Sequence, residues 1–276
     1  MKMLNYLLLT GSMGLALTTS QAALVPYHEN FNNQALGTSA PLDNQGTAWV
    51  QATGYSIVEA PSVFSGRSYN LNRTATTSLG LPSTFNVGTS LGGQSFTQRT
   101  EFVLDSLTEP TNNNTTRVGF GLLGSNNNFS GSYYLADFVV SGPANLLGTL
   151  RIIEIGGDEG DNRVNTVPPI AINLDDVYRM SISGSYTESN QLVLNFMVEN
   201  LTNPATVSMS TTYNTALAGT HFGYRNSVGQ NGAMDVTLDN FSLIPEPSSY
   251  AIFFGVISFI FMLIKRRTAL AKIKAS

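Results

Sequence analysis

Hydrophobic and polar residues alternate in short runs between residues 23 and 243, and no run there has helical spacing. The clearest run is "QLVLNFMVE", in which Leu192, Leu194, Phe196 and Val198 share one face of an extended chain. Alternation with period two is typical of a strand with one buried face. The same pattern predicts further strands at 99–105, 117–123, 133–140, 150–155, 177–183, 221–225 and 235–243.

Clusters of glycine, asparagine, serine and proline separate these runs. They include "TEPTNNNTT", "GSNNNFSGS" and "GGDEGDN", all of which have turn or loop composition. Many short strands joined by such turns predict antiparallel sheets, each with one buried face. We therefore expect an all-β protein, an antiparallel β-sandwich of the jelly-roll type. Because we find neither an internal repeat nor a linker, residues 23–243 are expected to form one domain.

The run "DVTLDNFSL" changes phase in its middle. Val236 and Leu238 share one face of a regular strand, whereas Phe241 and Leu243 fall on the other face. One extra residue at Asp239-Asn240 would bring all four side chains to the same side. The pattern therefore predicts a β-bulge at that point.

The charge of this domain differs from that of the whole chain. Residues 23–243 contain eight arginines, no lysine and 17 acidic residues, which gives −9, whereas the net charge of the whole chain is −4. An acidic domain argues against a nucleic-acid partner, which needs a basic face. It is compatible with neutral sugars or with divalent cations. Cysteine is absent, so disulfides cannot stabilise the fold.

The N-terminus has the features of a secretory signal peptide over residues 1–22. Lys2 precedes an apolar stretch of 12 residues from Tyr6 to Leu17, and small residues occupy the positions that signal peptidase reads. Cleavage is expected between Ala22 and Ala23. The alternative is a buried helix, which the short length and the flanking residues disfavour.

The C-terminal segment, residues 244–276, has three features in order. Pro245-Glu246-Pro247 comes first, then an apolar run at about 248–264, and then a basic tail at 265–276 that begins with Lys265, Arg266 and Arg267. The apolar run is just long enough to span a bilayer as one transmembrane helix, with the basic residues on the cytoplasmic side. Since proline fits poorly in strands and helices, Pro245 and Pro247 are expected to form a stiff, exposed spacer.

This arrangement resembles the PEP-CTERM sorting signal of exopolysaccharide-producing Gram-negative bacteria. The resemblance implies that an exosortase, a membrane-embedded cysteine peptidase, recognises Pro245, Glu246 and Pro247. The segment "TALAKIKAS" departs from the family, because it makes the tail longer than usual. A plain single-pass anchor is the alternative interpretation, since hydropathy alone does not exclude it.

The domain itself resembles laminin-G-like and concanavalin A-like jelly rolls. The segments that carry the resemblance are "HENFNNQALGT", "TAWV", "VFSGRSYNLN", "HFGYRNS" and "DVTLDNFSL". In that fold the first and last strands are neighbours, which would bring Glu29 close to Asp239. These two carboxylates are candidates for a structural Ca²⁺ site, although calcium takes 6–8 oxygen ligands and solvated strand-end carboxylates are the alternative.

Aromatic residues offer a second candidate site. Tyr133, Tyr134 and Tyr224, together with Trp49, are candidates for a flat platform on which a sugar ring stacks. The alternative is that they fill the core, which we favour for Trp49 because tryptophan is strongly buried on average.

No residue pattern indicates catalysis. Glycoside hydrolases need two facing carboxylates, and Glu154, Asp158 and Glu159 lack the Glu-x-Asp-x-x-Glu spacing of laminarinase-type enzymes. His28 and His221 lie far apart in the sequence and are expected to be ordinary strand residues.

Together these observations predict an exported protein of the cell surface or extracellular matrix. After signal peptidase and exosortase act, its role would be structural or adhesive, with carbohydrate such as exopolysaccharide as a candidate ligand. An exported glycoside-active enzyme and a plain membrane-anchored periplasmic protein are the alternatives.

Overall fold

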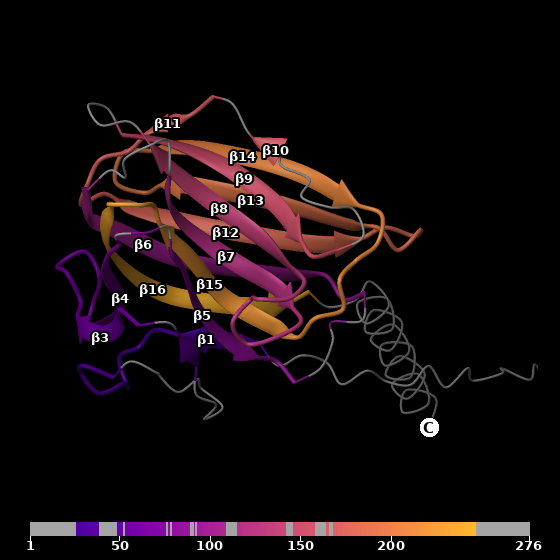
Figure 1. Cartoon of the computed structure of the whole chain (residues 1–276), viewed down its shortest axis with the longest axis horizontal. Coiled ribbons are helices and arrows are strands. Elements are labelled where there is room, and N and C mark those ends of the chain that lie inside the picture. Colours follow the sequence, from indigo (N-terminus) through magenta and orange to yellow (C-terminus); the bar gives the residue numbers. More distant parts are fainter. Residues whose placement is uncertain are drawn as a thin grey trace, which may run out of the picture.

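The structure of the protein is a computed structural model (Figure 1). It describes residues 26–38, 49–51, 53–75, 77, 79–88, 91, 93–108, 115–141, 146–157, 164–165 and 168–246. Several predictions of the sequence fall outside these residues. They are the signal peptide at 1–22 with its cleavage site at Ala22 and Ala23, the proposed transmembrane helix at 248–264, and the sorting residues Pro247, Lys265, Arg266 and Arg267.

The described strands form two sheets of eight strands each, and every strand pair is antiparallel. In sheet 1 the order is β14-β13-β12-β6-β16-β4-β3, and β1 also pairs with β16. The bounds of these strands are β1 Tyr27–Glu29, β3 Tyr55–Glu59, β4 Arg67–Thr74, β6 Phe96–Thr108, β12 Val177–Tyr186, β13 Leu192–Asn200, β14 Ala205–Tyr213 and β16 Ala233–Pro245.

In sheet 2 the order is β10-β9-β8-β7-β15-β5-β2, and β11 also pairs with β9. The bounds are β2 Val50–Gln51, β5 Leu79–Asn86, β7 Thr116–Gly124, β8 Tyr133–Ser141, β9 Leu147–Ile155, β10 Val164–Asn165, β11 Ile170–Ala171 and β15 His221–Val228. Every strand that the alternation predicted is present, which confirms the all-β assignment. Consecutive strands such as β12, β13 and β14 are neighbours, whereas β6 pairs with β12 and β16 across long connections.

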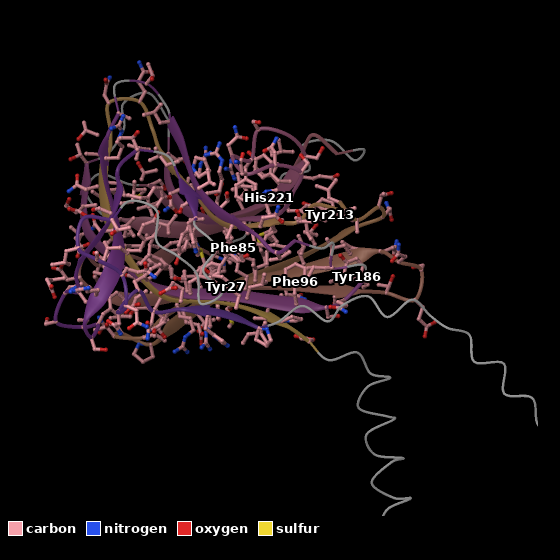
Figure 2. The ribbon with its side chains drawn as sticks, turned by 90° about the horizontal axis from the view of Figure 1, so that it is seen from below. Tyr27, Phe85, Phe96, Tyr186, Tyr213 and His221 are labelled. Carbon is pink, nitrogen blue, oxygen red and sulfur yellow. The ribbon has the colours of Figure 1, made fainter. Side chains whose placement is uncertain are left out.

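The two sheets pack face to face as a sandwich. Figure 1 shows their strands running in similar directions, one layer over the other. Figure 2 shows Tyr27, Phe96 and Tyr186 of sheet 1 in one row, whereas Phe85 and His221 of sheet 2 lie to one side of that row together with Tyr213 of sheet 1. The inward-facing side chains of both sheets form one continuous hydrophobic core. Hydrophobic and polar residues therefore alternate along the sequence because every second side chain of a strand enters the layer between the sheets.

Trp49 lies in this core, as predicted, with 1% of its surface exposed. Its ring contacts Phe85 at 5.1 Å, Phe241 at 5.1 Å and Tyr224 at 5.6 Å between centroids. Its indole N–H donates a hydrogen bond to the Tyr27 hydroxyl. Sheet 1, sheet 2 and the segment before β2 thus share one aromatic cluster.

The β-bulge at Asp239-Asn240 is confirmed. The register between β16 and β6 shifts between Asp239 and Ser242, and Asn240 has φ of 51°, a left-handed conformation that asparagine tolerates. Beyond the bulge, Phe241 and Leu243 are buried in the same core as Leu238. A second register shift, between Asp235 and Val236, was not predicted.

The neighbouring position of the first and last strands is also confirmed, since β1 pairs with β16 from Tyr27 opposite Leu243 to Glu29 opposite Phe241. The prediction that Pro245 begins an exposed spacer was wrong. Strand β16 continues through Pro245, which pairs with Phe96, and the Glu246 N–H donates to the Ser95 carbonyl at 2.8 Å. As the last residue of a strand, proline forfeits only one ladder hydrogen bond.

Among the residues that the structure describes, there is no helix with the length and apolar character needed to cross a membrane.

Candidate functional site

A row of charged side chains crosses the outer face of sheet 2. Asp137 on β8 pairs with Arg151 on β9 and with Gly119 on β7. On the other side of β7, Tyr224 pairs with Phe120 and Ser227 with Arg117, which places Arg225 beside Gly119. Since residues opposite each other in a sheet share a face, two arginines flank the aspartate on the same surface.

Asp137 and Arg151 form a buried ion pair. Asp137 is 1% exposed, and its Oδ2 accepts hydrogen bonds from both Nε and Nη2 of Arg151, the first at 3.1 Å. Nε of Arg117 lies 4.0 Å from the same oxygen. Burial raises the pKa of Asp137 above its ordinary value, while Arg151, Arg117 and Arg225 act in the opposite direction.

Two glycines make room for this row. A Cβ on Gly119 would lie 2.5 Å from Asp137 Oδ1, and a Cβ on Gly80 of β5 would overlap the Arg225 guanidinium. Side chains at these positions would push the aspartate and the arginine away from the sheet. The glycines therefore allow Asp137 and Arg225 to lie flat on the backbone of their neighbours.

Apolar side chains continue the surface beside the charged row. Tyr133 and Leu135 on β8 face the same way as Ile153 and Ile155 on β9, and they pack together in a second hydrophobic cluster outside the main core. Phe129, in the loop after β7, completes this cluster, and its ring lies 5.1 Å from that of Tyr133.

The charged row and the apolar side chains together line one hollow of about 300 Å³. Its walls include Arg117, Arg151 and Arg225 at one side and Tyr133 and Ile155 at the other, with further lining from Leu79, Gly80, Thr115, Leu135, Asp137, Ile153, Ser227, Val228 and Gly229. A volume of this size is at the lower end of the range for small-molecule and sugar sites.

The three tyrosines predicted to form a stacking platform do not share a surface, so that prediction was wrong. Tyr134 and Tyr224 are 0% exposed and belong to the main core. Tyr133 faces the opposite side of β8 and lines the hollow. Successive residues of a strand point to opposite faces, which separates Tyr133 from Tyr134.

The predicted calcium residues do lie near each other at the junction of β1, β6 and β16. Burial raises the pKa of Asp239 to about 7, and the charges of Glu101 and Glu29 raise it as well, although the Asn240 N–H bond to Asp239 opposes this. Glu29 Oε1 accepts a hydrogen bond from the Phe31 N–H at 2.6 Å. Among the described residues no group of three or more His, Cys, Asp or Glu side chains could hold a metal ion. The calcium site stays a prediction.

Among the other residues considered for catalysis, Asp158 and Glu159 lie outside the described residues, and the rest take structural positions. Glu154 is 1% exposed and points to the core side of β9, away from the hollow. His28 lies in β1 and His221 in β15, as expected of ordinary strand residues.

The charged row of the hollow was not predicted from the sequence. Arg117, Asp137, Arg151 and Arg225 all occupy outward positions of strands that were recognised correctly. A charged residue at such a position in a central strand is a usable signal. The pairing of the four strands, which places these residues side by side, was not available from the pattern.

No protein-family model matches this sequence, and no curated protein matches it. Solved structures are similar in fold. A variant of alginate lyase Aly36B in complex with alginate trisaccharide aligns with a TM-score of 0.51 and 12% identity, over 80% of this chain and 98% of its own. Lectin I from Ulex europaeus, in complex with the methyl glycoside of α-L-fucose, aligns with 0.47 and 12%, over 80% and 98%. The carbohydrate recognition domain of Emp47p aligns with 0.43 and 11%, over 82% and 97%. The shared feature is the concanavalin A-like jelly-roll sandwich.

Proposed function

We propose that this protein binds a polysaccharide in the hollow on the outer face of sheet 2. The observation that supports this is the composition of the hollow, in which Tyr133 and Ile155 lie beside Arg225 and Asp137. A sugar ring has an apolar face and a polar rim. A site with apolar side chains at one side and hydrogen-bonding groups at the other matches both.

The fold is compatible with this proposal. The similar structures include a lectin with a bound fucoside and a lyase with a bound alginate trisaccharide, so the same sandwich supports sugar binding elsewhere. Because fold alone does not imply function, the proposal depends on the hollow itself.

We propose binding rather than hydrolysis. A glycoside hydrolase needs two carboxyl groups about 5–10 Å apart across the substrate. Among the described residues that line the hollow, Asp137 is the only carboxylate, and it is held by Arg151. This arrangement has no general acid opposite a base or nucleophile.

The test fills the hollow without changing its charge. Wild-type protein is compared with Ser227→Phe, whose ring would occupy the hollow, in affinity electrophoresis against a panel of neutral, uronate-containing and sulfated polysaccharides. The matched control is Ser183→Phe, since Ser183 lies on the outer face of sheet 1 and is also partly exposed. We expect at least one polymer to retard the wild type and Ser183→Phe, and to retard Ser227→Phe about tenfold less. The proposal fails if no polymer retards the wild type, or if both variants behave alike.

We also propose that the protein is exported and sorted by its C-terminal segment to the surface or matrix of a Gram-negative bacterium. The sequence features at 1–22 and 244–276 support this. Intact mass of the native protein from membrane and extracellular fractions tests it. A species that begins at Ala23 and ends near Pro247 is expected. A membrane species that retains 248–264 would instead indicate a plain anchor.

A further inference from the structure

Positive charge is concentrated in the hollow although the domain is acidic. Residues 23–243 carry a net charge of −9 with only eight arginines and no lysine. Three of those arginines, Arg117, Arg151 and Arg225, line this one hollow. The net negative charge of the whole domain would repel an anion. The average composition therefore does not account for three arginines at one hollow.

The carboxylate of Asp137 does not neutralise these three guanidinium groups. Its Oδ2 is engaged by Arg151, and Arg117 approaches the same oxygen only to 4.0 Å. Arg225 donates one long hydrogen bond, from Nη1 to the Asn226 carbonyl at 3.4 Å, and its buried Nε has no partner. One negative and three positive side chains therefore leave the hollow with an excess of positive charge.

Unpartnered polar atoms gather at the same place. Asp137 Oδ1, Arg225 Nε and Ser227 Oγ are buried and make no hydrogen bond, and all three residues line the hollow. Each such atom lowers the folding stability, because it has lost its hydrogen bonds to water without gaining others. Other described residues also have such atoms, but these three adjoin one hollow, where a bound ligand could supply the missing partners.

The roles of the three arginines differ. The side chain of Arg151 is 11% exposed and is hydrogen-bonded to Asp137, so its role is to hold Asp137 in place. Arg117 is 30% exposed, and its Nε donates to the Thr115 hydroxyl at 2.9 Å. Arg225 is partly buried at the opposite side of Asp137 from Arg151, and both Arg117 and Arg225 line the hollow. A guanidinium has a planar fork of donors that matches a carboxylate or sulfate group.

We propose that the hollow is selective for acidic polysaccharides, with Arg225 and Arg117 binding the oxyanion of a sugar unit while Tyr133 and Ile155 contact its ring. This inference rests on the proposed function of the same hollow, and adds the class of ligand. The shared chemistry is a sugar that carries a carboxylate or a sulfate, so the experiment includes both.

The test compares a charged polymer with its uncharged form, and adds a polymer that carries a different anion. Binding of the protein to polygalacturonate is compared with binding to the same polymer after its carboxyl groups are reduced to alcohols, and with binding to a sulfated polysaccharide. We expect the reduced polymer to bind at least tenfold more weakly than the charged one. The affinity should also fall with added salt, because exposed charges are screened. A preference for the carboxylate or the sulfate polymer identifies the source of the anion.

Variants then assign the effect to named residues. Arg225→Gln and Arg117→Gln are each expected to weaken binding of the charged polymer about tenfold, with little effect on the neutral one. Arg99→Gln is the matched control, because Arg99 is exposed on the outer face of sheet 1 and its loss changes the net charge equally. Arg225→Lys should restore part of the affinity, since it keeps the charge without the fork. Unfolding midpoints confirm that each variant is folded.

Two results would overturn the inference in different ways. If the reduced polymer binds as tightly as the charged one, or if Arg99→Gln weakens binding as much as Arg225→Gln, the selectivity is wrong but polysaccharide binding stands. If no polymer of either kind binds, the proposed function fails together with the inference.

Discussion

The outer faces of the two sheets each hold a cluster of ionisable side chains around a buried aspartate. The two clusters differ in the charge of the aspartate's neighbours. On sheet 2, Asp137 is flanked by arginines, and opposite charges compensate each other. On sheet 1, Asp239 pairs with Glu101 across the ladder and lies near Glu29, so like charges gather beside the bulge.

The comparison shows how local partners decide the charge state of an aspartate. Asp137 is more deeply buried than Asp239, at 1% against 3% exposure. Burial raises the pKa of both aspartates, and that of Asp239 reaches about 7. The arginines around Asp137 offset much of the desolvation that burial imposes. Around Asp239 the neighbouring carboxylates add to it. Arg99 and His28 also line that surface, and Arg179 pairs with Glu101 at 2.8 Å.

The largest expected effect is on the compensated cluster. Asp137→Ala would leave the buried Arg151 without its partner and crowd three positive groups together. Breaking a buried ion pair typically costs about 3–5 kcal/mol, and we expect a loss of about 3 kcal/mol in the free energy of unfolding. Urea denaturation with linear extrapolation measures it. A loss below about 1 kcal/mol would mean that the pair is solvated, and the contrast between the two clusters would disappear.

In the like-charged cluster, replacing the aspartate is expected to raise the free energy of unfolding at high pH, whereas Asp137→Ala lowers it. The folded-state pKa of Asp239, about 7, lies above the value near 3.8 of the unfolded chain, so the folded state binds the proton more tightly. Its contribution to stability is therefore fully present below about pH 4 and is lost as the pH rises through 7. Asp239→Asn removes this dependence and should stabilise the protein by about 2 kcal/mol at pH 8.

The measurement is the free energy of unfolding of wild type and Asp239→Asn between pH 4 and 8, with a chelator present. The difference between them should grow as the pH rises. Equal slopes in the two proteins would show that Asp239 has an ordinary pKa. Repeating the pH 8 experiment with Ca²⁺ in place of the chelator tests the calcium prediction, since an ion held by Glu29 and Asp239 would raise the melting temperature of the wild type only.

A smaller effect is expected from the backbone under the charged row. In Gly119→Ala the new methyl group would meet Asp137 Oδ1 at 2.5 Å and the Ala136 carbonyl oxygen at 2.9 Å, so Asp137 must move. We expect a loss of about 1–2 kcal/mol, within the range for overpacking. Gly88→Ala and Gly93→Ala are poor controls for packing, because both glycines have a positive φ and their substitution would add backbone strain. If the free energy of unfolding of Gly119→Ala equals that of the wild type, Asp137 can move without a loss of stability.

The pattern of the sequence predicted the strands, the burial of Trp49 and the bulge at Asp239-Asn240. The strands and the bulge follow from alternation, which depends on nearest neighbours along the chain. The burial of Trp49 follows from the strong average burial of tryptophan. The hollow was not predicted, because Arg225 and Asp137 meet only through the pairing of β15, β7 and β8. The error on Tyr134 has a different cause, since alternation within the predicted strand already places Tyr133 and Tyr134 on opposite faces.

The smallest expected change in stability comes from an exposed ion pair of sheet 1. It shows how little an ion pair contributes when it is not buried. Glu199 lies 3.9 Å from Arg179, and both side chains are about one-third exposed, at 30% and 31%. Water screens such a pair, and exposed ion pairs contribute about 0–1 kcal/mol. Glu199→Ala should therefore change the free energy of unfolding by less than about 0.5 kcal/mol, measured in the same urea series. If its cost approached that of Asp137→Ala, burial would not be what separates the two clusters from ordinary surface charges.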